Sequence, residues 1–88
     1  YNTRLVTTST YTVVADDYYV GVNYAGVCTI TLPPSTNGDK VIVKDESGLC
    51  SVNNIILAGL VDNDPGGAIL AVDNGALHMI YRDGWRII

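Results

Sequence analysis

Apolar and polar positions alternate along much of the chain. Cys28, Ile30 and Leu32 fall on one face of their segment, and the threonines between them fall on the other. A period of two is typical of a β-strand that buries one face. The segments 10–15 and 18–24 alternate in the same way, and no segment keeps helical spacing over several turns. The pattern therefore predicts strands and no helix.

Turn-forming residues separate the alternating segments. Asn-Gly, Asp-Gly, Ser-Gly and Pro-Gly-Gly steps interrupt the chain, and Pro33-Pro34 bars continuation of the strand that ends at Leu32. The predicted strands are 4–7, 10–15, 18–24, 27–32, 40–45, 54–58, 68–72, 76–82 and 85–88. Short strands at this spacing predict one all-β domain over residues 1–88, arranged as a small antiparallel β-sandwich or a β-prism-like domain.

The last two predicted strands form a hairpin that is apolar on both faces. Asp83-Gly84 suits a two-residue type I′ turn, which sets Arg82 opposite Trp85. In that register one face carries His78, Ile80, Trp85 and Ile87, and the other carries Leu77, Met79, Tyr81 and Ile88. Two apolar faces require cover on both sides, from this domain's own core and from a neighbouring subunit. The residues expected at packing or interface positions are Trp85, Tyr81, Met79, Leu77 and Ile88.

The composition strengthens the expectation of an assembly. Hydrophobic residues make up 48% of the 88 positions and charged residues 16%. A chain of this size builds only a thin core, so the apolar surplus predicts an oligomer interface. The net charge is −4 and the five basic residues are scattered, which disfavours a nucleic-acid partner. No apolar run is long enough for membrane insertion. The chain has neither an initiating Met nor a signal peptide, so we expect a fragment of a longer protein.

The two cysteines, Cys28 and Cys50, are too few for a disulfide framework. We expect them to be small buried hydrophobes in reduced form, and a single bridge stays as the alternative. His78 is the only histidine and no Cys-x-x-Cys occurs, so no zinc site is expected.

Two acidic stretches could supply oxygen ligands to Ca²⁺. They are Asp16-Asp17 and the loop formed by Asp62, Asn63 and Asp64. The loop lacks a glycine and a bidentate glutamate at the offsets of a calcium-binding loop, so the favoured interpretation is a solvated turn. We keep Asp62, Asn63 and Asp64 as a candidate ligand-facing loop and expect no metal or cofactor.

Catalytic constellations are not evident. No spacing singles out a pair of acids for glycoside hydrolysis, and His78 alternates within a strand, where packing or an interface is favoured over general-base chemistry. Six tyrosines and one tryptophan could stack on sugars, but their spread through predicted strands favours packing. We expect no enzymatic activity.

An ordered set of short motifs covers the chain from about residue 10 to 88. They are Tyr11-Thr12-Val13, Asp17-Tyr18-Tyr19-Val20-Gly21-Val22, Thr31-Leu32-Pro33, Lys44-Asp45-Glu46-Ser47-Gly48, Asn54-Ile55 and Asp83-Gly84-Trp85. Together they resemble a β-rich module found near the ends of phage tail-fibre and other viral fibre-like proteins. The chain departs from that pattern where Trp85 directly follows the Asp-Gly turn, and in the stretch 60–67.

The resemblance implies a homotrimeric, non-catalytic module of a virion appendage, sometimes at the tip that contacts the host. Its partners would be further copies of itself and a glycan or protein receptor on the host surface. A lectin-like carbohydrate-binding domain is the alternative, because exposed tyrosines can recognise sugars.

Overall fold

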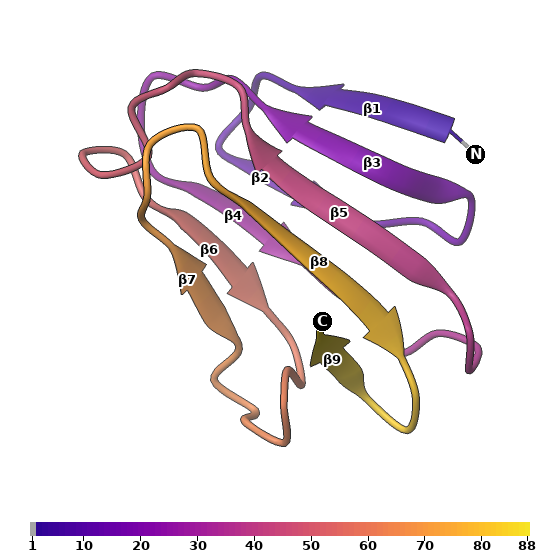
Figure 1. Cartoon of the computed structure of the whole chain (residues 1–88). Helices are drawn as coiled ribbons and strands as arrows, with labels where there is room; N and C mark the ends of the chain where they lie inside the picture. The colour runs from indigo at the N-terminus through magenta and orange to yellow at the C-terminus, as the bar shows by residue number, and fades with distance from the viewer. Residues whose placement is uncertain (1) are drawn as a thin grey trace.

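The computed structural model describes residues 2–88, and within them the chain forms nine strands and no helix (Figure 1). The strands are β1 (Asn2–Val6), β2 (Thr10–Thr12), β3 (Asp17–Val22), β4 (Cys28–Thr31), β5 (Lys40–Asp45), β6 (Ile55–Ala58), β7 (Ala68–Leu70), β8 (Ala76–Tyr81) and β9 (Trp85–Ile87). Each overlaps a segment that the alternation predicts, which confirms the all-β class. Tyr1, the first residue of the predicted domain, lies outside the described residues. No helix that could cross a membrane occurs in the described part of the chain.

The chain passes back and forth between two sheets. The first, sheet A, has the strand order β1-β3-β5-β8-β9, and the second, sheet B, has the order β2-β4-β6-β7. Successive strands up to β6 therefore alternate between the sheets, and within each sheet these strands run parallel. The first half of the fold thus resembles three stacked turns of a flattened coil (Figure 1).

The predicted antiparallel arrangement is wrong for this first half. Only the pairs β5–β8, β6–β7 and β8–β9 are antiparallel among residues 2–88. Strands that alternate apolar and polar positions are typical of antiparallel sheets with one wet face. Here the parallel strands also bury one face only, so the alternation does not reveal their direction.

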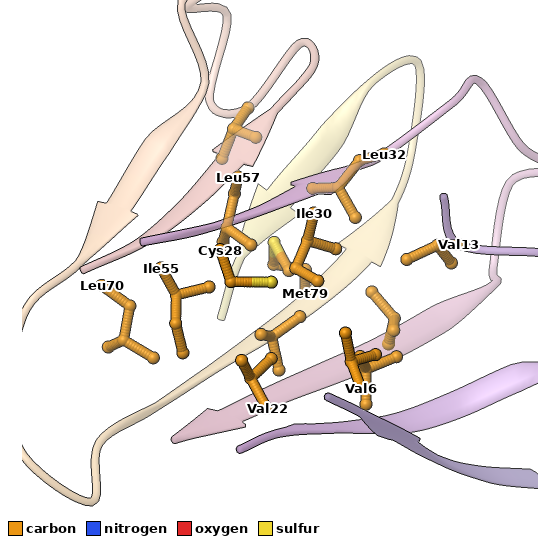
Figure 2. Close-up of a cluster of buried hydrophobic side chains, with 14 of the residues drawn as sticks. Val6, Val13, Val22, Cys28, Ile30, Leu32, Ile55, Leu57, Leu70 and Met79 are labelled. Atoms are coloured by element: carbon orange, nitrogen blue, oxygen red, sulfur yellow. The ribbon is translucent and has the colours of Figure 1, made fainter. Parts of the chain in front are cut away.

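The core lies between the sheets, where inward side chains of both meet (Figure 2). Val20 and Val43 of sheet A and Ile30 and Leu57 of sheet B have no exposed surface. Cross-strand neighbours share a face, so the register stacks Val20 on Val43 and Ile30 on Leu57. Inward-facing β-branched and leucine side chains of the parallel strands therefore form one continuous core.

Both cysteines are buried in this core, as predicted, and both are free thiols. Cys28 is the first residue of β4 (Figure 2), and Cys50 donates a 2.7 Å hydrogen bond from Sγ to the carbonyl oxygen of Leu70. Burial raises the pKa of each thiol. The cysteines therefore behave as small, neutral core residues.

The last hairpin is shifted by one residue from its predicted register. Tyr81 pairs with Trp85, so Arg82, Asp83 and Gly84 form a three-residue loop. Asp83 and Gly84 both adopt positive φ, and the Arg82 amide donates to the Gly84 carbonyl oxygen at 2.8 Å. A three-residue loop that ends in glycine is itself a common hairpin connection. The Asp-Gly step predicts a turn correctly but the wrong loop length.

This shift changes which residues share a face. Trp85 lies on the core side with Met79 and Tyr81, and the predicted pairing of Trp85 with Arg82 is wrong. The outward face carries His78 and Ile80, together with Ile88, whose amide bonds to the carbonyl oxygen of His78. One face of the hairpin therefore completes the core and the other faces away from it.

Candidate functional site

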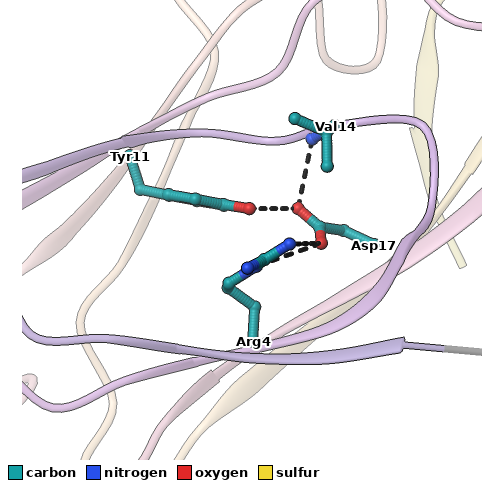
Figure 3. Close-up of polar contacts among 4 residues, drawn as sticks. All are labelled: Arg4, Tyr11, Val14 and Asp17. Carbon is teal, nitrogen blue, oxygen red and sulfur yellow. Dashed lines mark hydrogen bonds and ion pairs between the residues drawn. The ribbon is translucent and has the colours of Figure 1, made fainter.

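A buried carboxylate joins the first strands of the two sheets. The side chain of Asp17, at the start of β3, accepts hydrogen bonds from the Tyr11 hydroxyl at 2.5 Å and the Val14 amide at 3.1 Å (Figure 3). Its other oxygen lies 3.4 Å from Nε of Arg4. Arg4 belongs to β1 and Tyr11 to β2, so this cluster ties sheet A to sheet B. The Arg4 guanidinium also lies 5.8 Å from the centre of the Tyr11 ring, within reach of a cation–π contact.

The cluster raises the pKa of two of its members, Tyr11 and Arg4. Burial, followed by the hydrogen bond to Asp17, raises the pKa of Tyr11, so the hydroxyl stays protonated and donates. The pKa of Arg4 is also raised, chiefly by Tyr11 and then by Asp17. Both oxygens of the Asp17 carboxylate accept hydrogen bonds from groups of the chain itself.

A polar pocket lies beside this cluster, at the edge where β3 and β5 begin. It has a volume of about 380 Å³ and is lined by Ala15, Asp16, Asp17, Tyr18, Gly38, Asp39 and Lys40. This volume is within the usual range for small-ligand sites. Asp16 and Lys40 are exposed at its rim, whereas Asp39 accepts hydrogen bonds from the Ser35 hydroxyl and the Thr36 amide. The pocket therefore offers carboxylates, an ammonium and a tyrosine to a hydroxyl-rich ligand.

The predicted ligand-facing loop forms a tight turn. Val61 and Asp64 exchange backbone hydrogen bonds of 3.1 and 2.9 Å, and the two residues between them, Asp62 and Asn63, adopt positive φ. Aspartate and asparagine are among the few residues that tolerate this conformation. The turn thus explains why these residue types occupy the loop.

This turn is fastened to β9, the last strand of sheet A. The Asp62 amide donates to the Trp85 carbonyl oxygen at 2.8 Å, and the Asp62 carboxylate accepts from the Ile87 amide at 3.2 Å. The Asn63 side-chain oxygen accepts from the Arg86 guanidinium at 2.9 Å. Asp62 and Asn63 therefore have a structural role within the chain, and a role of the loop in ligand binding stays a prediction.

The residues predicted for packing or an interface divide between the two sides of the hairpin. Trp85, 3% exposed, donates from Nε1 to the Pro33 carbonyl oxygen at 3.0 Å, and its ring meets that of Tyr81 edge-on at 5.2 Å. Met79 is fully buried and Leu77 packs partly against the core. Ile88 is 68% exposed. Of the five, Ile88 alone is freely available to a neighbouring subunit.

A second buried carboxylate belongs to Asp45, and the sequence pattern does not predict its burial. Its oxygens accept hydrogen bonds from the Ser47 amide and hydroxyl and from the amides of Cys50 and Asn74. Burial alone would raise the pKa of Asp45, but these four hydrogen bonds outweigh it and the pKa is lowered. The Asp-x-Ser-Gly step that begins at Asp45 indicates an Asx-turn, but its link to Asn74 is invisible in the sequence.

The described residues form no evident metal-binding site. Within residues 2–88, no three His, Cys, Asp or Glu side chains come together in a way that could hold a metal ion. His78 is exposed on the outer side of β8. The two acidic stretches, Asp16-Asp17 and the Asp62 turn, each serve contacts within the chain instead.

Comparison with known protein families and with curated proteins finds no match for this chain.

Proposed function

We propose that the chain is a non-catalytic structural module of a viral or phage fibre or tail appendage, which trimerises and contributes to attachment at the host surface. The proposal starts from the resemblance of its ordered motifs to such modules. It locates the chain in the virion, outside the host cell when the appendage functions.

The observation that carries the proposal is the two-faced terminal hairpin. Its inner face packs on the core through Met79 and Trp85, while its outer face presents Ile80 half-buried and Ile88 exposed, with His78 between Ile88 and Ile42 of β5. Isoleucines on the outside of a sheet suit a protein interface, and here they lie among the polar residues His78, Arg86 and Lys40 of the same face. Three copies packed through the outer face of sheet A would form a β-prism-like trimer.

The buried carboxylates support a structural role. Asp17 and Asp45 have both oxygens engaged by donors from the chain itself. Carboxylates held in this way stabilise loops and strand ends.

Light scattering at micromolar concentration tests the proposal. We expect a trimeric mass for the wild type and a smaller mass for Ile88→Lys, because a charge at the interface opposes association. Ile69→Lys is the matched control: Ile69 is 62% exposed but lies on the outer side of sheet B. A stable monomeric mass for the wild type would contradict trimerisation.

The pocket beside Asp17 favours a second candidate, a lectin-like carbohydrate-binding domain. Tyr18 supplies an aromatic ring, and Asp16 and Lys40 supply charged hydrogen-bonding groups. Glycan-array binding that is lost in Asp16→Asn and Lys40→Ala, by a protein of monomeric mass, would favour this candidate alone. Binding by a trimer would combine the two.

A further inference from the structure

We propose that the edges of β1 and β2 together form a docking surface for a second copy of this chain. The two strands are the edge strands of their sheets. They lie at the same side of the molecule because the strand orders β1-β3-β5 and β2-β4-β6 run in step in the two sheets (Figure 1). The surface defined by β1 and β2 is called the open side below. This inference is independent of the proposed function.

Backbone groups on the open side have no partner strand. The carbonyl oxygen of Val6 accepts from the Asn23 amide, so Val6 and Arg4 direct their backbone groups toward β3. Backbone groups alternate along a strand, so those of Thr3 and Leu5 point outward. Neither residue has a backbone hydrogen-bond partner on that side within the described part of the chain.

The same holds for β2 in sheet B. The Thr29 amide donates to the Ser9 carbonyl oxygen, and the Val13 amide donates to the Thr31 carbonyl oxygen. By the same alternation Thr10 and Thr12 direct their backbone groups outward. One of these groups, the Thr10 carbonyl oxygen, accepts a 2.8 Å hydrogen bond from the Thr8 hydroxyl. The open side therefore presents four residues whose backbone groups point away from the molecule, two on each sheet.

Soluble proteins usually protect such edges with charged side chains, proline or bulges. The segment 2–12 contains no proline, and its only charged residue is Arg4, whose side chain is 47% exposed and lies 3.4 Å from Asp17. One register irregularity occurs, between Asn2 and Thr3, at the very start of β1. Leu5 is 60% exposed on this unprotected strand. Within the described residues, protection of the open side is limited to one charged side chain and one irregularity at the start of β1.

A second copy fits this surface better than a single extended peptide does. A peptide strand could pair with β1 or with β2, but one strand cannot reach both sheets, which stack roughly 10 Å apart in such folds. A two-fold axis normal to the sheets places β1 against its counterpart in the second copy and β2 against its own counterpart, both antiparallel. Such an interface is self-complementary and closed, so it ends at two copies.

This arrangement brings the two Arg4 residues opposite each other at the axis, and the ion pair of each Arg4 with its own Asp17 at 3.4 Å offsets part of their repulsion. In one antiparallel register of the two β1 strands, all outward amides and carbonyl oxygens of Thr3 and Leu5 form hydrogen bonds. This register places Thr3 of one copy opposite Leu5 of the other. Cα atoms of directly opposed residues are close enough for a disulfide if both are replaced by cysteine.

Sedimentation equilibrium of the wild type and of Leu5→Pro tests the proposal. The Leu5 amide faces outward, so proline removes no bond within the chain and is tolerated on an edge strand. We expect the wild-type assembly to have twice the mass of the variant. A hexamer that becomes a trimer supports both the proposed function and this inference, and a dimer that becomes a monomer supports this inference alone. Equal trimeric masses would overturn the inference but not the proposed function, and equal monomeric masses would overturn both.

Cross-linking provides a second measurement that does not depend on the proline variant. A mixture of Thr3→Cys and Leu5→Cys proteins, mildly oxidised, should form a disulfide-linked dimer between the two variants. Ile69→Cys, on the opposite edge strand of sheet B, is the matched control and should form none. The native cysteines are buried and should not interfere. Absence of a cross-link above the control would overturn the proposed pairing.

Discussion

The two edge strands of sheet A, β1 and β9, differ in whether their outward backbone groups are hydrogen-bonded. At β9 the amide of Trp85 donates to the Leu60 carbonyl oxygen, and Asp62 bonds both the Trp85 carbonyl oxygen and the Ile87 amide. At β1 the outward groups of Thr3 and Leu5 meet no partner among residues 2–88. Within residues 2–88 the chain therefore closes one edge with its own loop, and the outward backbone groups of the other edge stay unpaired.

This difference shows how few residues are needed to close an edge. A single tight turn brings Asp62 alongside β9, and the Leu60 carbonyl oxygen, the Asp62 amide and the Asp62 carboxylate take the place of a neighbouring strand. The turn also links the end of β6 in sheet B to β9 in sheet A, through a bridge between Val61 and Trp85. The open side instead joins its sheets by the polar cluster of Arg4, Tyr11 and Asp17.

Removing the anchor of the closed edge should have the largest effect. Trp85→Ala should lower the free energy of unfolding by about 3–5 kcal/mol, the usual cost of deleting a buried large aromatic side chain. Trp85→Phe keeps a ring against Tyr81 but loses the bond to Pro33, and should cost roughly 1–2 kcal/mol. Urea unfolding measures both. An unchanged transition for Trp85→Ala would contradict its packing role and favour an exposed sugar-stacking platform.

Low pH should destabilise the fold through protonation of Asp45, which lies away from the β1 and β9 edges. Its folded pKa is lowered, so its stabilising effect is complete above the ordinary carboxyl pKa of about 4 and is lost as the pH falls through the lowered value. Asp45→Asn should cost about 2 kcal/mol near neutral pH and lose less further stability between about pH 5 and about pH 2 than the wild type does. Chemical unfolding across that range measures the difference. Parallel acid profiles for the two proteins would contradict this assignment.

Removing the side-chain hydrogen bond between Asp62 and β9 should have an intermediate effect on the free energy of unfolding. Asp62→Ala removes the acceptor for the Ile87 amide and places alanine at positive φ, so we expect a loss of about 1–2 kcal/mol. Asp62→Asn keeps a side-chain oxygen and tolerates the same backbone conformation, so it should cost less than half as much. Thermal unfolding compares the two variants, and equal losses would show that the carboxylate bond to β9 contributes little.

The polar cluster of the open side should contribute least. Tyr11→Phe removes one hydrogen bond to Asp17 while Arg4 and the Val14 amide remain, so we expect a loss of about 1 kcal/mol. In a domain of this size that corresponds to a fall in Tm of about 4–8 °C. A fall as large as that of Trp85→Ala would show that the cluster, and not the closed edge, dominates stability.

The sequence predicts where the strands lie but not how they pair. Alternation locates each strand because burial of one face is a local property, visible in Cys28, Ile30 and Leu32. Pairing is not local: β1 bonds β3 only after the chain has crossed to sheet B and returned. The parallel direction of the first strands follows from those crossings and leaves no mark in the alternation.

Local chemistry also explains which parts of the candidate site are predictable. Asp62 and Asn63 are recognisable as a turn because few residue types tolerate positive φ. Their bonds to β9 join residues more than twenty positions apart, and no local pattern encodes them. The pocket residues Tyr18 and Lys40 are likewise brought together only by the pairing of β3 with β5.

Amide hydrogen exchange tests the contrast between the edges most directly. At concentrations low enough to give the smallest assembly, the amides of Trp85 and Ile87 should exchange slowly, and those of Thr3, Leu5, Thr10 and Thr12 should exchange rapidly. Raising the protein concentration should slow those four amides and leave Trp85 and Ile87 unchanged. Rapid exchange at Ile87, or slow exchange at Thr3 and Leu5 in the smallest assembly, would contradict a closed β9 edge and an open β1 edge.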